Sequence, residues 1–132
     1  MIDVEYDVFD YVYPYVSELL PEGGFKSVYV PSPPVLPHAT LVEIDNYTNT
    51  YTLGTADEEE FAVLTYEAQT YAYDKETCRQ IMAAICTAMH SLGFIRISMR
   101  FIENLNDPTI FRMVARFRAM ANADKTIFRT KY

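Results

Sequence analysis

Five arginines at strand spacing are the residues whose chemistry stands out in this sequence. They fall in two late segments that alternate polar with apolar residues, and they are Arg96, Arg100, Arg112, Arg116 and Arg118. Because alternate residues of a strand point to the same face of a sheet, each segment presents its arginines on one side. Guanidinium groups bind carboxylates and phosphates through paired, charge-assisted hydrogen bonds. If the two sides coincide, the sheet carries a basic face that can bind acidic groups.

A basic face of this kind needs acidic partners, because like charges on one sheet face repel one another. Glu67 occupies the corresponding face of its own predicted strand, and Glu43 and Asp45 are candidates for the same face. The sequence leaves three partners open for the arginines. They are these acids of the same copy, the acidic half of a neighbouring copy, and nucleic acid.

The charge is divided unevenly along the chain. Residues 1–60 hold twelve Asp or Glu and one Lys, so their net charge is -11, whereas residues 61–132 have a net charge of +4. The total of -7 argues against non-specific nucleic-acid binding, which requires neutralised phosphates. The two unlike halves are suited to pairing, either within one copy or between copies.

No combination of residues predicts catalysis or metal binding. His38 and His90 are the only histidines and lie outside any metal-spaced cluster, and the serines lack the context of a nucleophile elbow. With four glycines the chain has no phosphate-binding loop. Cys78 and Cys86 are eight residues apart in a predicted helix, so we expect reduced thiols. We therefore expect no enzyme activity, no cofactor and no metal.

Periodicity and turn residues predict two helices and a sheet. The first helix is expected to begin at Asp3 and to be kinked or split in two by Pro14, and the second to run from Asp74 to Gly93. Strands are expected at 27–30, 40–46, 61–73, 94–105 and 109–122. The pattern predicts one α+β domain over residues 1–132, with an antiparallel sheet of four to five strands and two helices packed on one face.

Two long connections are candidates for contact with partners, because long ordered loops in compact domains are usually functional. One is the proline-rich stretch 31–37, and the other is the stretch 47–60, which we expect to be a flexible loop. The residues singled out in them are Pro33, Pro34, Tyr47, Tyr51, Asp57, Glu58 and Glu59. Residues 123–132 are expected to be a C-terminal arm or a short edge strand.

Together these patterns resemble the tail terminator proteins of long-tailed bacteriophages, also called tail completion or neck proteins. The similarity runs from the first helix through Ala119, and its most telling segments are residues 40–46, 64–71, 91–94 and 106–117. These segments match as patterns of strand, helix and turn and contain no catalytic fingerprint. The resemblance implies a structural virion protein with no catalytic site.

The resemblance also implies an assembly and a set of partners. Such proteins form a ring of copies, a hexamer, on the head-proximal end of the tail tube, where they end tube polymerisation and form the surface to which the head attaches. The implied partners are the tail tube protein, the head-completion or stopper protein, and DNA in transit through the lumen. The implied location is the virion, after assembly in the host cytoplasm.

Other functions remain open from the residues alone. Within the same class, the chain is compatible with another neck component, such as a head-closure or adaptor protein. A monomeric binding module presenting tyrosine-rich loops and a small hydrolase or nuclease subunit using Glu67 are the alternatives from other classes. No apolar run is long enough for a membrane helix, and Met1 to Glu5 do not resemble a secretory signal, so we expect an intracellular protein.

Overall fold

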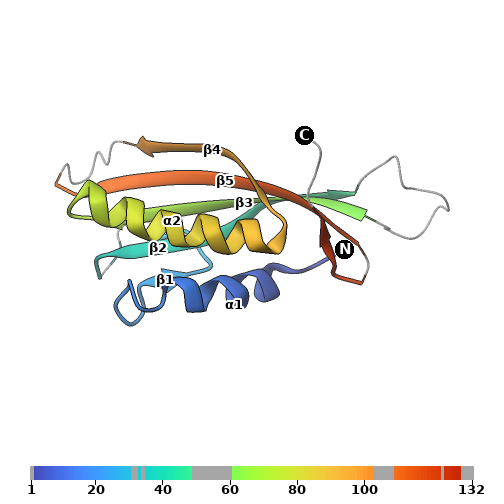
Figure 1. The fold of residues 1–132 in the computed structure, drawn as a ribbon, viewed down its shortest axis with the longest axis horizontal. Helices are drawn as coiled ribbons and strands as arrows, with labels where there is room; N and C mark the ends of the chain where they lie inside the picture. The colour runs from blue at the N-terminus through green and yellow to red at the C-terminus, as the bar shows by residue number, and fades with distance from the viewer. Residues whose placement is uncertain are drawn as a thin grey trace.

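A computed structural model describes residues 2–30, 33, 35–48, 61–102, 109–122 and 124–128. Two helices and six strands follow one another along this part of the chain (Figure 1). In chain order they are α1 (Glu5–Val16), β1 (Phe25–Lys26), β2 (His38–Thr48), β3 (Phe61–Ala72), α2 (Lys75–Leu92), β4 (Ile95–Ile102), β5 (Phe111–Asn122) and β6 (Ile127–Phe128).

The strands form one mostly antiparallel sheet in the order β1-β2-β3-β5-β4. The four long strands β2, β3, β5 and β4 are antiparallel neighbours, and the two-residue strand β1 pairs in parallel with β2. The two-residue strand β6 pairs with β5, inside the segment for which an arm or a short strand was expected. The predicted α+β fold with an antiparallel sheet and two helices is confirmed.

The core lies between the helices and one face of the sheet. Helix α2 packs on β3 and β5, and α1 packs beside α2 and against β2. Each helix buries one apolar stripe, as expected for amphipathic helices on a sheet. The buried positions include Val8, Val12 and Val16 of α1, Ile81, Met82, Ile85 and Met89 of α2, and Leu41, Leu64, Tyr66, Ala68, Ala115 and Phe117 of the sheet.

The predicted ends of α2 are confirmed by its capping geometry. The Asp74 carboxylate accepts hydrogen bonds from the Thr77 backbone N–H at 3.1 Å and from the Thr77 hydroxyl at 2.6 Å. At the other end Gly93 has a φ of 106°, which a glycine adopts without steric cost, and its N–H bonds to the carbonyl of His90 at 3.0 Å. These local signals fix where α2 begins and ends on the sheet.

Helix α1 begins one residue later than predicted, and of the kink or split expected at Pro14 the split does not occur. The helix continues through Pro14 to Val16 and is not split in two. Pro14 lies in the last turn of the helix. Because proline has no backbone N–H, the helix loses one hydrogen bond there. At the other end Val4 takes the N-cap position that was predicted for Asp3, and the Asp3 carboxylate accepts the N–H of Glu5 at 3.2 Å.

Candidate functional site

The site begins with the sheet face that points away from the helices, which we call the open face. Register places Arg112 of β5 opposite Tyr71 of β3, and Arg116 opposite Glu67. Because residues directly opposite each other in an antiparallel pair share a face, these side chains lie together. The alternation of β5 continues unbroken through this segment, so the predicted shared face of Arg112, Arg116 and Arg118 is confirmed.

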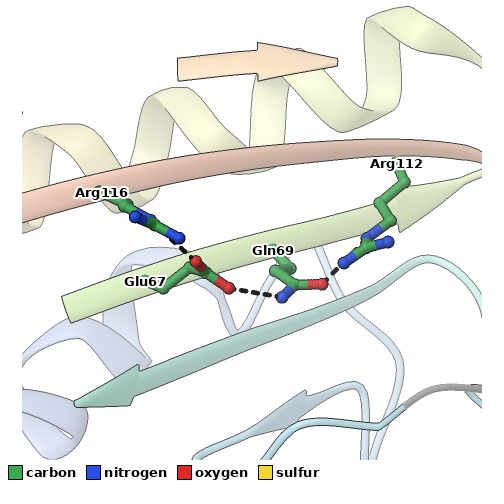
Figure 2. A network of polar contacts seen from close by, with 4 residues as sticks. All are labelled: Glu67, Gln69, Arg112 and Arg116. Carbon is green, nitrogen blue, oxygen red and sulfur yellow. Dashed lines mark hydrogen bonds and ion pairs between the residues drawn. The ribbon is translucent and has the colours of Figure 1, made fainter. Parts of the chain in front are cut away.

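A chain of hydrogen bonds holds two of these arginines in place (Figure 2). Arg116 Nε donates to Glu67 Oε2 at 3.0 Å, and Gln69 Nε2 donates to Glu67 Oε1 at 2.7 Å. Arg112 Nε donates to Gln69 Oε1 at 3.0 Å, and the hydroxyl of Tyr71 donates to the same oxygen at 2.8 Å. The Arg112 guanidinium also lies 5.8 Å from the centre of the Tyr71 ring. The predicted placement of Glu67 on the face of the arginines is confirmed, and of the partners left open its own copy supplies the one for Arg116.

A depression of about 430 Å³ lies over this network, and we call it the arginine depression. Its lining is Glu67, Ser98, Arg100, Ile102, Arg112, Val114 and Arg116. Arg100 has no ion-pair partner among the residues that the structure describes. Within the described lining, three guanidinium groups thus meet one carboxylate, which makes this part of the depression basic. Its chemistry suits the binding of carboxylates or phosphates, with Ile102 and Val114 offering apolar contact.

Arg96 does not belong to this cluster, and its predicted placement beside Arg100 was wrong. The register of β4 on β5 shifts between Arg96 and Ser98, so Arg96 lies opposite Phe117 on the helix side of the sheet. One extra residue in a strand reverses the faces of the side chains that precede it. Arg96 Nη1 contacts the Met99 sulfur at 3.4 Å and lines a separate depression near Cys86 of α2.

Glu43 is displaced by a second irregularity of the same kind. The register of β2 on β3 shifts between Glu43 and Asp45, so Glu43 lies opposite Tyr66 on the helix side. The candidate placement of Glu43 on the face of the arginines was wrong. Asp45 lies opposite Thr65, on the open face as expected, and its side chain is exposed.

Arg118 lies on the open face but outside the arginine depression. It is opposite Thr65 on one side and Ile95 on the other. Its Nε is buried and has no hydrogen-bond partner within the described ranges. Arg118 therefore contributes positive charge to the open face beside the depression.

Sequence reasoning missed a second, acidic surface at the start of α1. Asp3, Glu5, Tyr6, Phe9 and Asp10 line it together with Ser27, which follows β1. Burial, and secondarily the neighbouring carboxylate of Asp3, raise the pKa of Glu5. The strongly negative charge of residues 1–60 pointed to this half of the chain, but it did not show which acids gather.

Few of the predicted loop contacts fall on described residues. Pro33 is half-buried and lies outside any strand. Tyr47 is an exposed residue of β2 and pairs with Val63 of β3, so its predicted place in a flexible loop was wrong. The rest of that predicted loop, residues 49–60, lies outside the described residues. The other predicted contact residues, Pro34, Tyr51, Asp57, Glu58 and Glu59, lie outside the described residues.

Comparison with known proteins finds no matching family model and no matching curated protein. Among the described residues, no group of three or more His, Cys, Asp or Glu is placed to hold a metal ion. Both cysteines are free thiols, with Cys78 buried and Cys86 half-buried. No described helix is long and apolar enough to span a membrane. The two charged surfaces are therefore the features of the described chain that point to a function.

The position of Glu43 gives a stability prediction. Burial, followed by the nearby carboxylate of Glu5, raises the pKa of Glu43 in the folded chain. The folded state therefore holds the proton of Glu43 more tightly than the unfolded state, and ionised Glu43 lowers stability at neutral pH. We expect Glu43→Gln to unfold at a higher urea concentration than wild type at pH 7. This advantage shrinks as the pH falls and disappears below about pH 4, where the wild-type glutamate is protonated and position 43 is neutral in wild type and variant alike.

Asp45→Asn is the matched control, because it removes the same charge from an exposed position just beyond the irregularity. Its urea midpoint is expected to follow that of wild type across this pH range. A Glu43→Gln variant that is less stable than wild type at pH 7 would show that the buried carboxylate is stabilising, which is the opposite of the effect expected from its raised pKa.

Proposed function

We propose that this protein is the ring-forming subunit of a phage tail terminator, which ends polymerisation of the tail tube and provides the surface for head attachment. The observation that carries the proposal is the arginine depression. Its three arginines share one carboxylate, Glu67, within the described part of the protomer. A basic surface of this composition is suited to an acidic partner surface.

The second support is that an acidic surface lies elsewhere on the same protomer. The acids at the start of α1 lie on the helix side of the sheet, near the edge that β1 and β2 form. The arginine depression is on the open face, over β3, β5 and β4. Two different patches on opposite sides of the sheet permit a head-to-tail contact, which closes into a ring when the rotation between copies divides a full turn.

The assignment to a tail terminator, rather than to another ring, comes from the resemblance of the strand, helix and turn pattern. On this proposal the ring is a hexamer, with the tail tube protein on one side and the head-completion protein on the other. DNA passes through the lumen without a tight contact. The overall negative charge of the chain is compatible with such a passage.

Mass measurement and electron microscopy of the purified protein test the assembly. We expect closed rings of uniform mass at low salt, which dissociate as salt rises because exposed charge pairs are screened. Arg100→Glu is expected to reduce the assembled fraction while leaving the melting temperature nearly unchanged, since Arg100 has no ion pair among the described residues. A protein that stays monomeric at every concentration contradicts the proposal and favours the binding module.

The terminator role needs a separate assay. Added to polymerising tail tube protein, the ring is expected to stop elongation and give shorter tubes. Rings that leave the tube length unchanged would contradict the terminator assignment and favour another neck component.

A further inference from the structure

We infer that the arginine depression binds the acidic start of helix α1 from the next copy of the chain. The inference rests on the proposed ring and names the two surfaces that meet in it. The receiving surface is the arginine depression, and the entering surface is the first two turns of α1 with the residues just before them. The charge, the shape and the placement of the two surfaces on opposite sides of the sheet support this contact.

The two surfaces are complementary in charge. Among the described residues that line the depression, Arg100, Arg112 and Arg116 against Glu67 give a formal charge of +2. At the start of α1, Asp3, Glu5 and Asp10 line the acidic surface, and Asp7 lies in the first turn of the same helix. Among the described residues, Asp7 has Lys125 Nζ at 4.0 Å, and the other three have no ion-pair partner. Both surfaces therefore hold charge that their own described protomer does not neutralise.

The two surfaces are also complementary in shape and polarity. Tyr6 projects from α1 among these acids, and its side chain is 76% exposed. The depression of about 430 Å³ has Ile102 and Val114 in its lining beside the arginines. A tyrosine side chain near the centre of an interface, surrounded by charge pairs, is a typical anchor of a protein interface. Tyr6 supplies that anchor, and the acids around it meet the guanidinium groups.

The acidic start of α1 cannot reach the depression of its own copy, because the sheet separates them. Helix α1 packs against α2 and β2, on the helix side of the sheet (Figure 1). The depression opens on the other face and is lined by residues of β3, β5 and β4. A contact between the two surfaces must therefore join different copies, and it leaves one surface of each kind free to continue the ring.

A second copy fits the depression better than nucleic acid does. Binding a phosphate backbone to one face would bring the chain's net charge of -7 toward a polyanion. The next copy instead supplies its negative charge locally, at α1. The same contact repeated around the ring pairs opposite charges on both surfaces of every subunit.

Reversing the charge on each surface, separately and together, tests the contact. Arg100→Glu and Asp10→Lys are chosen because both residues are exposed and neither belongs to the hydrogen-bond chain around Glu67. Each variant alone is expected to weaken assembly roughly tenfold or more, a factor that corresponds to about 1.4 kcal/mol. In an equimolar mixture of the two variants, Glu at position 100 of one copy can meet Lys at position 10 of the other, so assembly is expected to recover in part. In the double variant every contact has this reversed pair, so assembly is expected to recover throughout. Sedimentation at low salt measures all of these states.

Glu18→Lys is the matched control for Asp10→Lys, because it makes the same charge change at an exposed residue beyond the other end of α1. It is expected to assemble as wild type does. Recovery of assembly in the double variant supports the contact. Weakening by Arg100→Glu without weakening by Asp10→Lys, or a folded double variant that does not recover, overturns it and leaves the ring itself standing. A wild-type chain that never assembles overturns the ring as well.

Discussion

Leu64→Ala is expected to lower the free energy of unfolding by about 2–5 kcal/mol, as deletion of a fully buried leucine side chain does. Leu64 is 0% exposed and lies in β3, the strand between β2 and β5. Its cross-strand neighbours are Asn46 and Ala119. Leu64 belongs to the same core cluster as the buried residues of the two helices. The cavity left by alanine therefore falls within the helix–sheet interface. Urea unfolding followed by circular dichroism measures the loss.

Leu19→Ala provides the matched comparison, because it deletes the same atoms from a side chain that is 41% exposed. It is expected to cost well under half as much as Leu64→Ala, since water already covers much of Leu19 in the folded chain. Equal losses for the two variants would contradict the placement of the core. The pair also calibrates the assembly experiments, because a variant as unstable as Leu64→Ala would lose its rings merely by unfolding.

Elements whose signals are local could be predicted from the sequence. Helix α2 has a capping aspartate at one end and a left-handed glycine at the other, so its bounds follow from Asp74 and Gly93. Strand β5 alternates without interruption, so the common face of Arg112, Arg116 and Arg118 follows from counting by two. In both cases the residues that determine the structure are neighbours in the chain.

Elements whose geometry depends on a partner strand could not be predicted in the same way. The register shifts of β2 and β4 move Glu43 and Arg96 to the helix side, although their sequences alternate acceptably without any shift. A bulge is defined by two residues facing one residue of the neighbouring strand, so it is invisible in one strand alone. The cluster of acids around Tyr6 was missed because it forms where α1 packs next to Ser27, a contact between residues that are distant in the sequence.

Tertiary structure also determines which side chains cover the open face of a central strand. Gln69 and Tyr71 alternate with apolar residues on the same face of β3 as Glu67, and both side chains are buried. Arg112 reaches from β5 to bond with Gln69 and to stack on Tyr71. A long arginine on the adjacent strand thus covers a face that alternation alone marks as solvent-exposed.

Glu67→Ala is expected to change stability and assembly in opposite directions. Glu67 accepts hydrogen bonds from Arg116 and Gln69, and its side chain is 18% exposed. Removing it leaves the buried Gln69 amide without this acceptor, which costs about 1–3 kcal/mol of unfolding free energy. The Arg116 side chain is 53% exposed, so its own share is at most about 1 kcal/mol. At the same time the arginine depression gains one net positive charge, so rings held by acidic α1 surfaces should persist to higher salt.

Glu67→Gln separates the two effects, because it removes the charge and can keep one amide oxygen as an acceptor for Gln69. It is expected to lose less stability than Glu67→Ala and to show the same gain in salt resistance. Urea unfolding gives the first quantity, and the salt concentration at half-dissociation of the ring gives the second. Weaker rings in a fully folded Glu67→Gln variant would mean that the Glu67 carboxylate itself binds a positively charged side chain of the neighbouring copy. The depression would then receive a basic surface, and the direction of the contact inferred from the charges of α1 would be reversed.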